Sequence, residues 1–170
     1  MTTITPRSAG AVIAERTEIA FDVRGLPLAQ GSARAFVVGR RAIITTGVKL
    51  GTPLGAWRNA IATEARAAVT GPLWTGPVEV ALVFRMPRPQ SHYHPANARR
   101  LTPELRLDAP SYHIAAPDSD KAARAALDAL SDVVYRDDRQ VARLLVTKRY
   151  VDETEGPGVN VRVRQLEETR

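Results

Sequence analysis

The segment APDSDKAARAALDALSDVVYRDDRQV, residues 116–141, predicts an amphipathic helix followed by a turn and a strand. Its apolar residues recur at helical spacing and form one stripe, made of Ala122, Ala123, Ala126, Leu127 and Leu130. The charged side chains of Lys121, Arg124 and Asp128 lie together on the opposite side of the helical wheel. We therefore expect a helix over residues 119–132 with one packed face and one charged face.

Acidic residues flank this helix at both ends. Asp118 and Asp120 stand at its start, where residues two apart in extended chain point the same way, and Asp137 and Asp138 follow its end. The residues VVYR, 133–136, are expected to run extended and to bring the second pair most of the way back. Carboxylates that meet at one place form an oxygen site suited to Mg²⁺ or Mn²⁺.

Each of these charged residues also has an ordinary structural explanation. An aspartate at a helix start commonly caps the free N–H groups, and a pair of aspartates commonly shapes a turn. Arg124 and Asp128, four residues apart, can form a surface ion pair. The residues alone leave both explanations open.

Outside this segment the chain predicts several strands and one more helix. Thr52 and Pro53 are typical of a helix start, and this helix is expected to continue to about residue 69. Residues 87–110 predict a long loop. Because strands outnumber helices without regular βαβ alternation, we expect an α+β fold in one domain over residues 18–165, with tails at 1–17 and 166–170. The strands are expected at residues 18–24, 35–38, 42–45, 78–86, 140–151 and 159–163.

The charge of the chain is basic and unevenly distributed. Among 170 residues, 24 Lys and Arg stand against 18 Asp and Glu, a formal net charge of +6. Residues 24–107 hold twelve basic and three acidic residues, and the remainder holds twelve basic and fifteen acidic ones. This distribution suggests a surface for a polyanion near a separate acidic site, with a merely solvated basic surface as the alternative.

Several classes of protein are excluded. There is no cysteine, which rules out a disulfide scaffold, a thiolate metal site and a cysteine nucleophile. The chain has no G-x-S-x-G motif and no Gly-rich phosphate loop. It has no apolar run near the ~18 residues of a membrane span and no signal-peptide pattern at its start. We expect a cytoplasmic protein without a membrane partner or small-molecule cofactor.

The chain carries three ordered motifs, which are Pro117-Asp118-Ser119-Asp120, Leu127-Asp128-Ala129-Leu130 and Asp137-Asp138-Arg139-Gln140, followed by Lys148. These motifs resemble the RusA family of Holliday junction resolvases, which are small phage- and prophage-associated endodeoxyribonucleases. A first strand, a Pro/Gly loop, a helix and a strand ending in MPRP extend the likeness over about residues 18–163.

The resemblance implies a small mixed β-sheet with two main helices packed on it, working as a homodimer on branched DNA. It implies metal ligands at Asp118, Asp120 and Asp138, with Asp137 as a supporting acid. The activity implied is Mg²⁺-dependent resolution of four-way junctions in recombination and repair, by paired symmetric nicks through metal-activated water, with Mn²⁺ as a possible substitute.

The chain departs from the family at the start of this helix. The family commonly reads D-N-L-x-K, whereas this chain reads Asp120-Lys121-Ala122-Ala123-Arg124. Arg124 therefore matches the family's lysine, and Lys121 is a second cation beside it. Arginine binds phosphate bidentately but exchanges protons poorly at neutral pH. Arg124 can replace a lysine that acts by charge, whereas Lys121 would have to replace one that transfers a proton.

Basic residues elsewhere are candidates for contact with DNA phosphates, which is independent of sequence and weakens with salt. Two other functions stay open: a non-catalytic nucleic-acid-binding module, and a metal-dependent nuclease with another branched target or RNA. Metal-dependent cleavage of a branched substrate distinguishes the first, and substrate competition distinguishes the second. The candidate DNA contacts are Arg34, Arg40, Arg41, Arg88 and Lys148.

Overall fold

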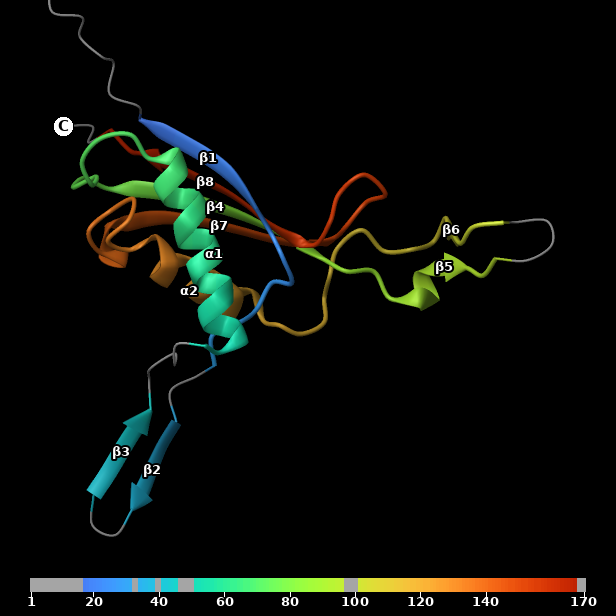
Figure 1. The fold of residues 1–170 in the computed structure, drawn as a ribbon, viewed down its shortest axis with the longest axis horizontal. Coiled ribbons are helices and arrows are strands. Elements are labelled where there is room, and N and C mark those ends of the chain that lie inside the picture. The colour runs from blue at the N-terminus through green and yellow to red at the C-terminus, as the bar shows by residue number, and fades with distance from the viewer. Residues whose placement is uncertain (1–16, 32–33, 39–40, 46–50, 97–100, 168–170) are drawn as a thin grey trace, which may run out of the picture.

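The computed structural model describes residues 17–31, 34–38, 41–45, 51–96 and 101–167. Its body is a four-stranded sheet with both long helices on one face (Figure 1). The β1–β8 and β8–β4 pairs are antiparallel and the β4–β7 pair is parallel. The mixed sheet and its two helices confirm the predicted α+β fold. The strands lie in the order β1 (Glu18–Arg24), β8 (Gly158–Gln165), β4 (Val78–Met86) and β7 (Val141–Tyr150).

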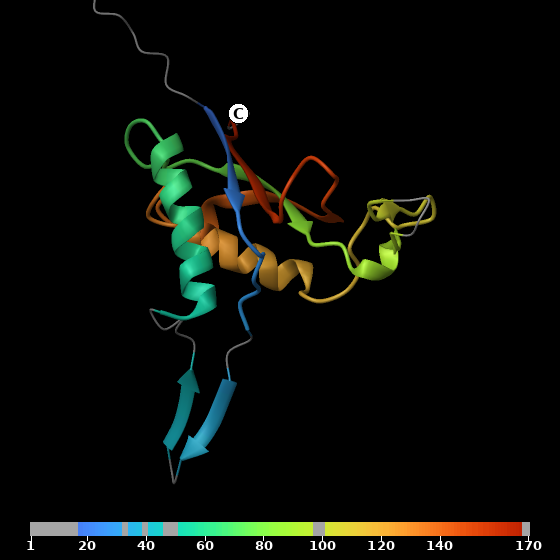
Figure 2. The same ribbon diagram turned by 45° about the vertical axis from the view of Figure 1, so that its right-hand side comes forward.

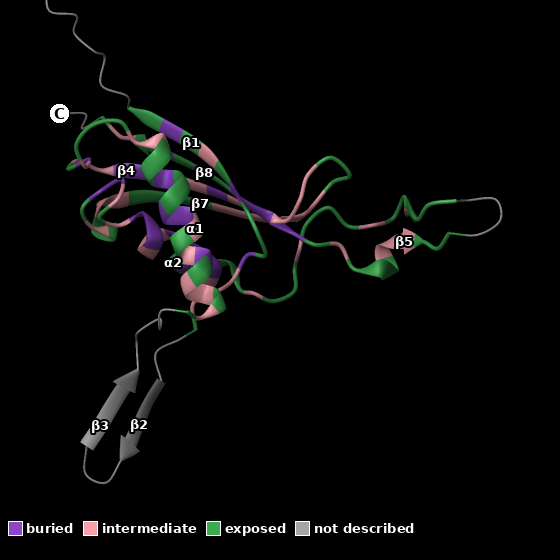
Figure 3. Cartoon of the chain, in the orientation of Figure 1, coloured by how far each residue is buried: buried purple, intermediate pink, exposed green. Residues whose placement is uncertain are grey.

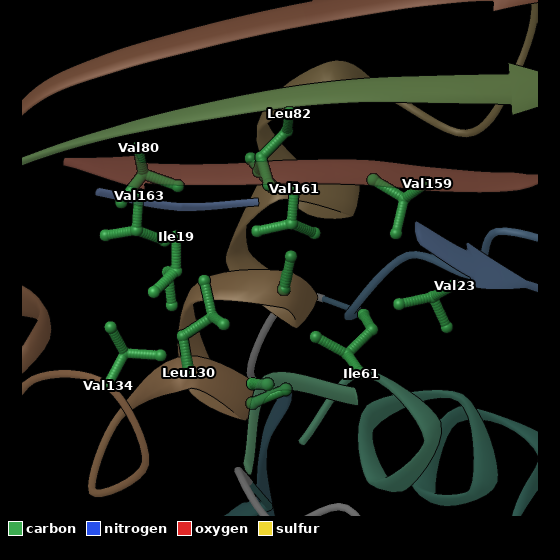
Figure 4. Packing of buried hydrophobic residues seen from close by; sticks show 14 of the residues in the cluster. Ile19, Val23, Ile61, Val80, Leu82, Leu130, Val134, Val159, Val161 and Val163 are labelled. Atoms are coloured by element: carbon green, nitrogen blue, oxygen red, sulfur yellow. The ribbon is translucent and has the colours of Figure 1, made fainter. Parts of the chain in front are cut away.

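Alternating apolar residues of the strands build the core against the helices. Figure 4 shows Val80 and Leu82 of β4 and Val161 of β8 pointing toward Ile61 and Leu130 on the helices. All five side chains are at most 1% exposed. Removing a side chain of this size from water contributes roughly 1.5–3 kcal/mol, so this one layer supplies much of the stability.

The first helix, α1 (Pro53–Ala68), begins where the sequence predicted. The Thr52 hydroxyl accepts a hydrogen bond of 3.1 Å from the backbone N–H of Gly55, and Pro53 occupies the first turn, where its missing N–H costs nothing. The second helix, α2 (Ser119–Leu130), ends two residues before its predicted end. Its buried residues are mostly alanine, which lets it pack closely on the sheet and α1.

The predicted extended path for residues 133–136 is wrong. The chain reverses immediately after α2, with the N–H of Val134 donating to the carbonyl of Leu130 at 2.9 Å and that of Asp132 to Tyr135 at 2.8 Å. Val134 and Tyr135 are fully buried. Because both side chains must enter the core, this stretch turns inward, and the short helix η2 (Asp138–Gln140) then leads into β7.

Two hairpins extend from the body, as Figures 1 and 2 show from two directions. The strands β2 (Arg34–Val38) and β3 (Arg41–Thr45) confirm the hairpin predicted there. Within the predicted long loop, η1 (Gln90–His92) precedes a short hairpin of β5 (Tyr93–His94) and β6 (Glu104–Leu105). The buried residues gather in the sheet and helices, and this second hairpin is largely exposed (Figure 3).

The start of β8 packs too closely on β1 to accept a side chain. A Cβ on Gly158 would overlap the carbonyl oxygen of Val23 and meet the buried guanidinium of Arg85. We expect Gly158→Ala to lower the free energy of unfolding by about 1–3 kcal/mol, the usual cost of overpacking. Urea unfolding measures this change in stability. Gly156→Ala is the control, because a Cβ on Gly156 would meet no atom within 4 Å. Equal stability of both variants would contradict the close approach of β1 and β8.

Candidate active site

A cavity of about 540 Å³ brings together four of the five catalytic candidates. Asp120, Lys121 and Arg124 reach it from the first half of α2, and Asp138 reaches it from η2. The cavity therefore holds both carboxylates and cations, and leucine and valine side chains form part of its wall. Its remaining lining residues are Gln30, Ser119, Ala123, Leu127, Leu144 and Val146.

Asp118 and Asp120 do not share one direction as expected, because the helix has already begun between them. Asp118 is the N-cap and Asp120 lies in the first turn. Asp120 lines the cavity, but Asp118 is not among its lining residues. Residues of a helix point apart with the helical rotation, whereas the expectation assumed extended chain.

Asp118 occupies the cap position without capping the helix. Its side chain accepts no cap hydrogen bond, and its carboxylate instead pairs with the Lys121 ammonium at 2.6 Å. This ammonium, with a smaller contribution from Lys148, holds the pKa of Asp118 below its usual value. The same pair raises the pKa of Lys121. Lys121 therefore stays protonated near neutral pH.

Asp137 and Asp138 are neighbours with different surroundings. The Asp137 carboxylate accepts a hydrogen bond of 2.9 Å from the N–H of Arg139 and pairs with the Arg139 guanidinium at 2.8 Å. This guanidinium lowers the pKa of Asp137 to about 2. Asp137 is thus occupied in shaping the turn, as its structural explanation predicted, and the exposed Asp138 faces the cavity.

Arg124 does not form the surface ion pair that its spacing from Asp128 allowed. Asp128 pairs instead with Arg58 of α1 at 3.4 Å, which ties the two helices together. Arg124 is exposed and lines the cavity. A guanidinium in this place can bind two oxygens of one phosphate.

Two of the three candidate metal ligands share the cavity, and the three do not form a tight cluster. Within the described ranges, no group of three or more His, Asp or Glu side chains could by itself hold a metal ion. Asp120 and Asp138 supply carboxylate oxygens to the cavity, and Asp118 stands at the start of the same helix. All of these ligand atoms are carboxylate oxygens, which Mg²⁺ and Mn²⁺ prefer over sulfur or nitrogen ligands.

The basic candidates outside the cavity have varied positions. Arg88 donates to the carbonyls of Val151 and Pro110, both at 2.8 Å, and its guanidinium lies over the Tyr150 ring. Lys148 also donates to backbone carbonyls. The backbone of Arg34 and Arg41 lies in the β2–β3 hairpin. Their side chains, and the whole of Arg40, lie outside the part that the structure describes.

Two glutamines near the site had no role among the expectations from the sequence. The backbone N–H of Gln30 donates to the carbonyl of Lys121 at 3.0 Å, which places Gln30 in the cavity wall. The side-chain amide of Gln140 accepts a hydrogen bond from the backbone N–H of Arg136 and donates one to the carbonyl of Trp74. The signal available for Gln140 was its place in the Asp137–Gln140 motif, and the composition of the Pro/Gly loop offered none for Gln30.

A comparison with protein families places the chain in a class of DNA-cleaving hydrolases. The family model described as Endodeoxyribonuclease RusA matches residues 30–164, which is most of the chain. The chain therefore belongs to the RusA endodeoxyribonuclease family and is a Holliday junction endodeoxyribonuclease of that family. The match confirms the resemblance seen in the motifs.

A search of the curated proteins found no significant match to this chain. Over the ranges that the structure describes, no helix has the length and apolar character needed to cross a bilayer.

The different surroundings of Asp137 and Asp138 predict different results from their removal. We expect Asp137→Ala to lower the melting temperature slightly and to slow junction cleavage only a few-fold, because the turn that carries Asp138 loses its cap but keeps the Asp138 carboxylate. We expect Asp138→Ala to keep the melting temperature and to lose cleavage. Thermal denaturation and a junction cleavage assay measure both variants. The reverse pattern would mean that Asp137, not Asp138, serves the reaction.

Proposed function

We propose that this endodeoxyribonuclease resolves four-way junctions by hydrolysing one phosphodiester in each of two opposing strands, as a homodimer that uses Mg²⁺. The observation that carries this proposal is the cavity in which Asp120 and Asp138 lie with Lys121 and Arg124. Carboxylates alone would repel a DNA phosphate. A cavity with both signs of charge accommodates a cation on its acids and a phosphate on its bases.

The aspartates are the proposed ligands of the metal. Asp120 and Asp138 would hold it from the cavity wall, and Asp118 would join them from the helix start, with Mn²⁺ as a possible substitute. When bound, the ion supplies a water of lowered pKa and neutralises charge that develops on the phosphate. Asp137 supports this site indirectly, because its cap on η2 holds the turn that carries Asp138.

The two cations of α2 are proposed to act by charge. Arginine keeps its proton throughout the ordinary pH range, and the pKa of Lys121 is raised by its carboxylate partner. Neither side chain is suited to releasing a proton near neutral pH. Arg124 would bind the non-bridging oxygens and stabilise the extra charge of the transition state. Lys121 would hold the Asp118 carboxylate in place.

The basic half of the chain is proposed to supply affinity for the junction. Arg34 and Arg41 of the β2–β3 hairpin, with Arg40 next to Arg41 in the sequence, would contact phosphates, and the charge of Arg88 would add to the attraction. Lys148, the remaining candidate, donates to backbone carbonyls instead. A two-fold dimer would present two equivalent active sites to a four-way junction, which has matching symmetry. Two nicks at symmetric positions then follow from the symmetry of the complex.

The proposal is tested with a labelled synthetic four-way junction and a linear duplex of the same sequence. We expect cleavage of the junction in Mg²⁺, none in EDTA, and little cleavage of the duplex. Unlabelled flaps, forks and RNA added as competitors report the preferred target. Tight binding without cleavage in any divalent cation would favour a binding module. Stronger competition by flaps or forks than by the junction would favour another branched substrate.

A further inference from the structure

We propose that Gln140 and Lys148 are positioning residues, which together set the spacing between the two acidic segments of the active site. Gln140 holds the turn that carries Asp138, and Lys148 holds the segment that leads into Asp118. Both belong to strand β7 or its immediate start. The inference rests on the proposed function, because it assigns these residues to the reaction performed at that site.

Gln140 uses the full hydrogen-bonding capacity of its side-chain amide. Its Oε1 accepts from the backbone N–H groups of Arg136 at 2.9 Å and Asp137 at 3.1 Å. Its Nε2 donates to the carbonyls of Trp74 and Gly76, both at 2.9 Å. An amide offers two acceptor sites and two donors, so this one is fully occupied and its orientation is determined. It fastens the turn before Asp138 to the segment that leads into β4.

Lys148 makes the corresponding contact at the other acidic segment. Its Nζ donates to the carbonyls of Ala115 at 2.8 Å and Pro117 at 2.5 Å, directly before Asp118. The backbone carbonyl of Lys148 also accepts from the N–H of His113 at 3.1 Å. Hydrogen bonds from a charged donor are stronger than neutral ones. They fix the approach to α2, whose N-cap residue supplies no cap hydrogen bond of its own.

Strand β7 connects these two contacts rigidly. It pairs with β4 along its length, and β4 is a buried strand with partners on both sides. Gln140 directly precedes Val141, the first residue of β7, and Lys148 lies eight residues after Gln140. The rise of a strand, about 3.3 Å per residue, therefore defines how far apart the two contacts stand. Acids that contact one phosphodiester or one ion need such a fixed separation.

The role of Lys148 is distinguished from that of a phosphate contact by salt dependence. We expect Lys148→Met to slow single-turnover cleavage by about 10- to 100-fold, because a small misplacement of reacting groups is costly. In EDTA, this variant should bind the junction with unchanged affinity. The slope of the logarithm of the binding constant against the logarithm of the salt concentration should also stay unchanged. Lys148→Arg, which keeps donors and charge, should recover much of the rate. A slope reduced by about one, with weaker binding, would identify a phosphate contact and overturn the assignment.

Gln140 is tested in the same assays with two variants. Gln140→Met removes all four hydrogen bonds, and Gln140→Glu keeps the acceptors but loses the donors to Trp74 and Gly76. We expect both to lower the cleavage rate without weakening junction binding in EDTA. Gln90→Met serves as the matched control, since Gln90 is an exposed glutamine in η1. Thermal denaturation identifies any variant whose loss of rate reflects unfolding.

Junction cleavage by the unchanged protein shows whether a negative result contradicts this inference alone or the proposed function as well. If the unchanged protein cleaves junctions and the Gln140 and Lys148 variants cleave equally fast, the positioning roles are wrong and the function stands. If the unchanged chain binds junctions but cleaves none in Mg²⁺ or Mn²⁺, the proposed function fails and the positioning roles fail with it. Slower variants with unchanged binding support both.

Discussion

Asp120→Asn should abolish junction cleavage and leave junction binding intact or tighter. The substitution keeps the size of the side chain while it removes a negative charge and a proposed metal ligand. Asp120 lies in the cavity between α2 and β7, so the loss of charge reduces its repulsion of the DNA phosphate. We expect the rate in Mg²⁺ to fall to the level that the unchanged chain shows in EDTA.

Cleavage and binding of a labelled junction, measured side by side, test this expectation. Asp132→Asn is the matched control, because Asp132 is an exposed aspartate in the turn after α2 and is not among the residues lining the cavity. The control should cleave at the original rate. Full activity of Asp120→Asn would remove Asp120 from the active site.

Arg124→Ala should slow turnover by about 10²- to 10³-fold, the range found when one charge-stabilising donor is removed from an active site. Arg124→Lys should keep much of the rate, because it retains the positive charge at the cavity. The structure favours a role for Arg124 through its charge. Lys121, the other cation at the cavity, is paired with Asp118 and has a raised pKa, so it is not suited to transferring a proton. A proton-transfer role would instead give Arg124→Lys a markedly different pH–rate profile.

Single-turnover rates of the two variants over a range of pH measure this effect. Arg66→Ala is the control, since Arg66 is an exposed arginine in the last turn of α1. If Arg124→Ala and Arg124→Lys both cleave like the unchanged chain, the charge at this position has no role in the reaction.

Much of the fold follows from local patterns in the sequence. The alternation in β4 and the cap at Thr52 predicted elements that the structure confirms. Burial on one face of a strand imposes alternation, and the free N–H groups at a helix start favour a capping side chain. The path of the chain after α2 could not be predicted from local patterns. The residues VVYR have strand-like character, but Val134 and Tyr135 turn inward to fill the core. Tertiary packing there overrides the local preference.

The candidate site was predictable in its residues and less so in its geometry. The motifs identified the segments of Asp120 and Asp138, which share a cavity in the structure. The spacing of Asp118 and Asp120 suggested convergence, but the helix begins between them. The anchoring contacts of Gln140 join residues more than sixty positions apart. A local sequence pattern cannot predict a contact between residues so far apart in the sequence, so these contacts become visible only in the folded structure.

Resolution of a four-way junction by paired, metal-dependent nicks is the main activity that we expect. A supercoiled plasmid that extrudes a cruciform tests it directly, with Mg²⁺ and with EDTA, beside Asp120→Asn. Two nicks made within one complex convert the plasmid to linear DNA, and we predict linear product in Mg²⁺ that is absent in EDTA and with the variant. Nicked circles without linear product, or equal cleavage of a plasmid lacking the cruciform, would show that the protein does not resolve junctions by paired nicks.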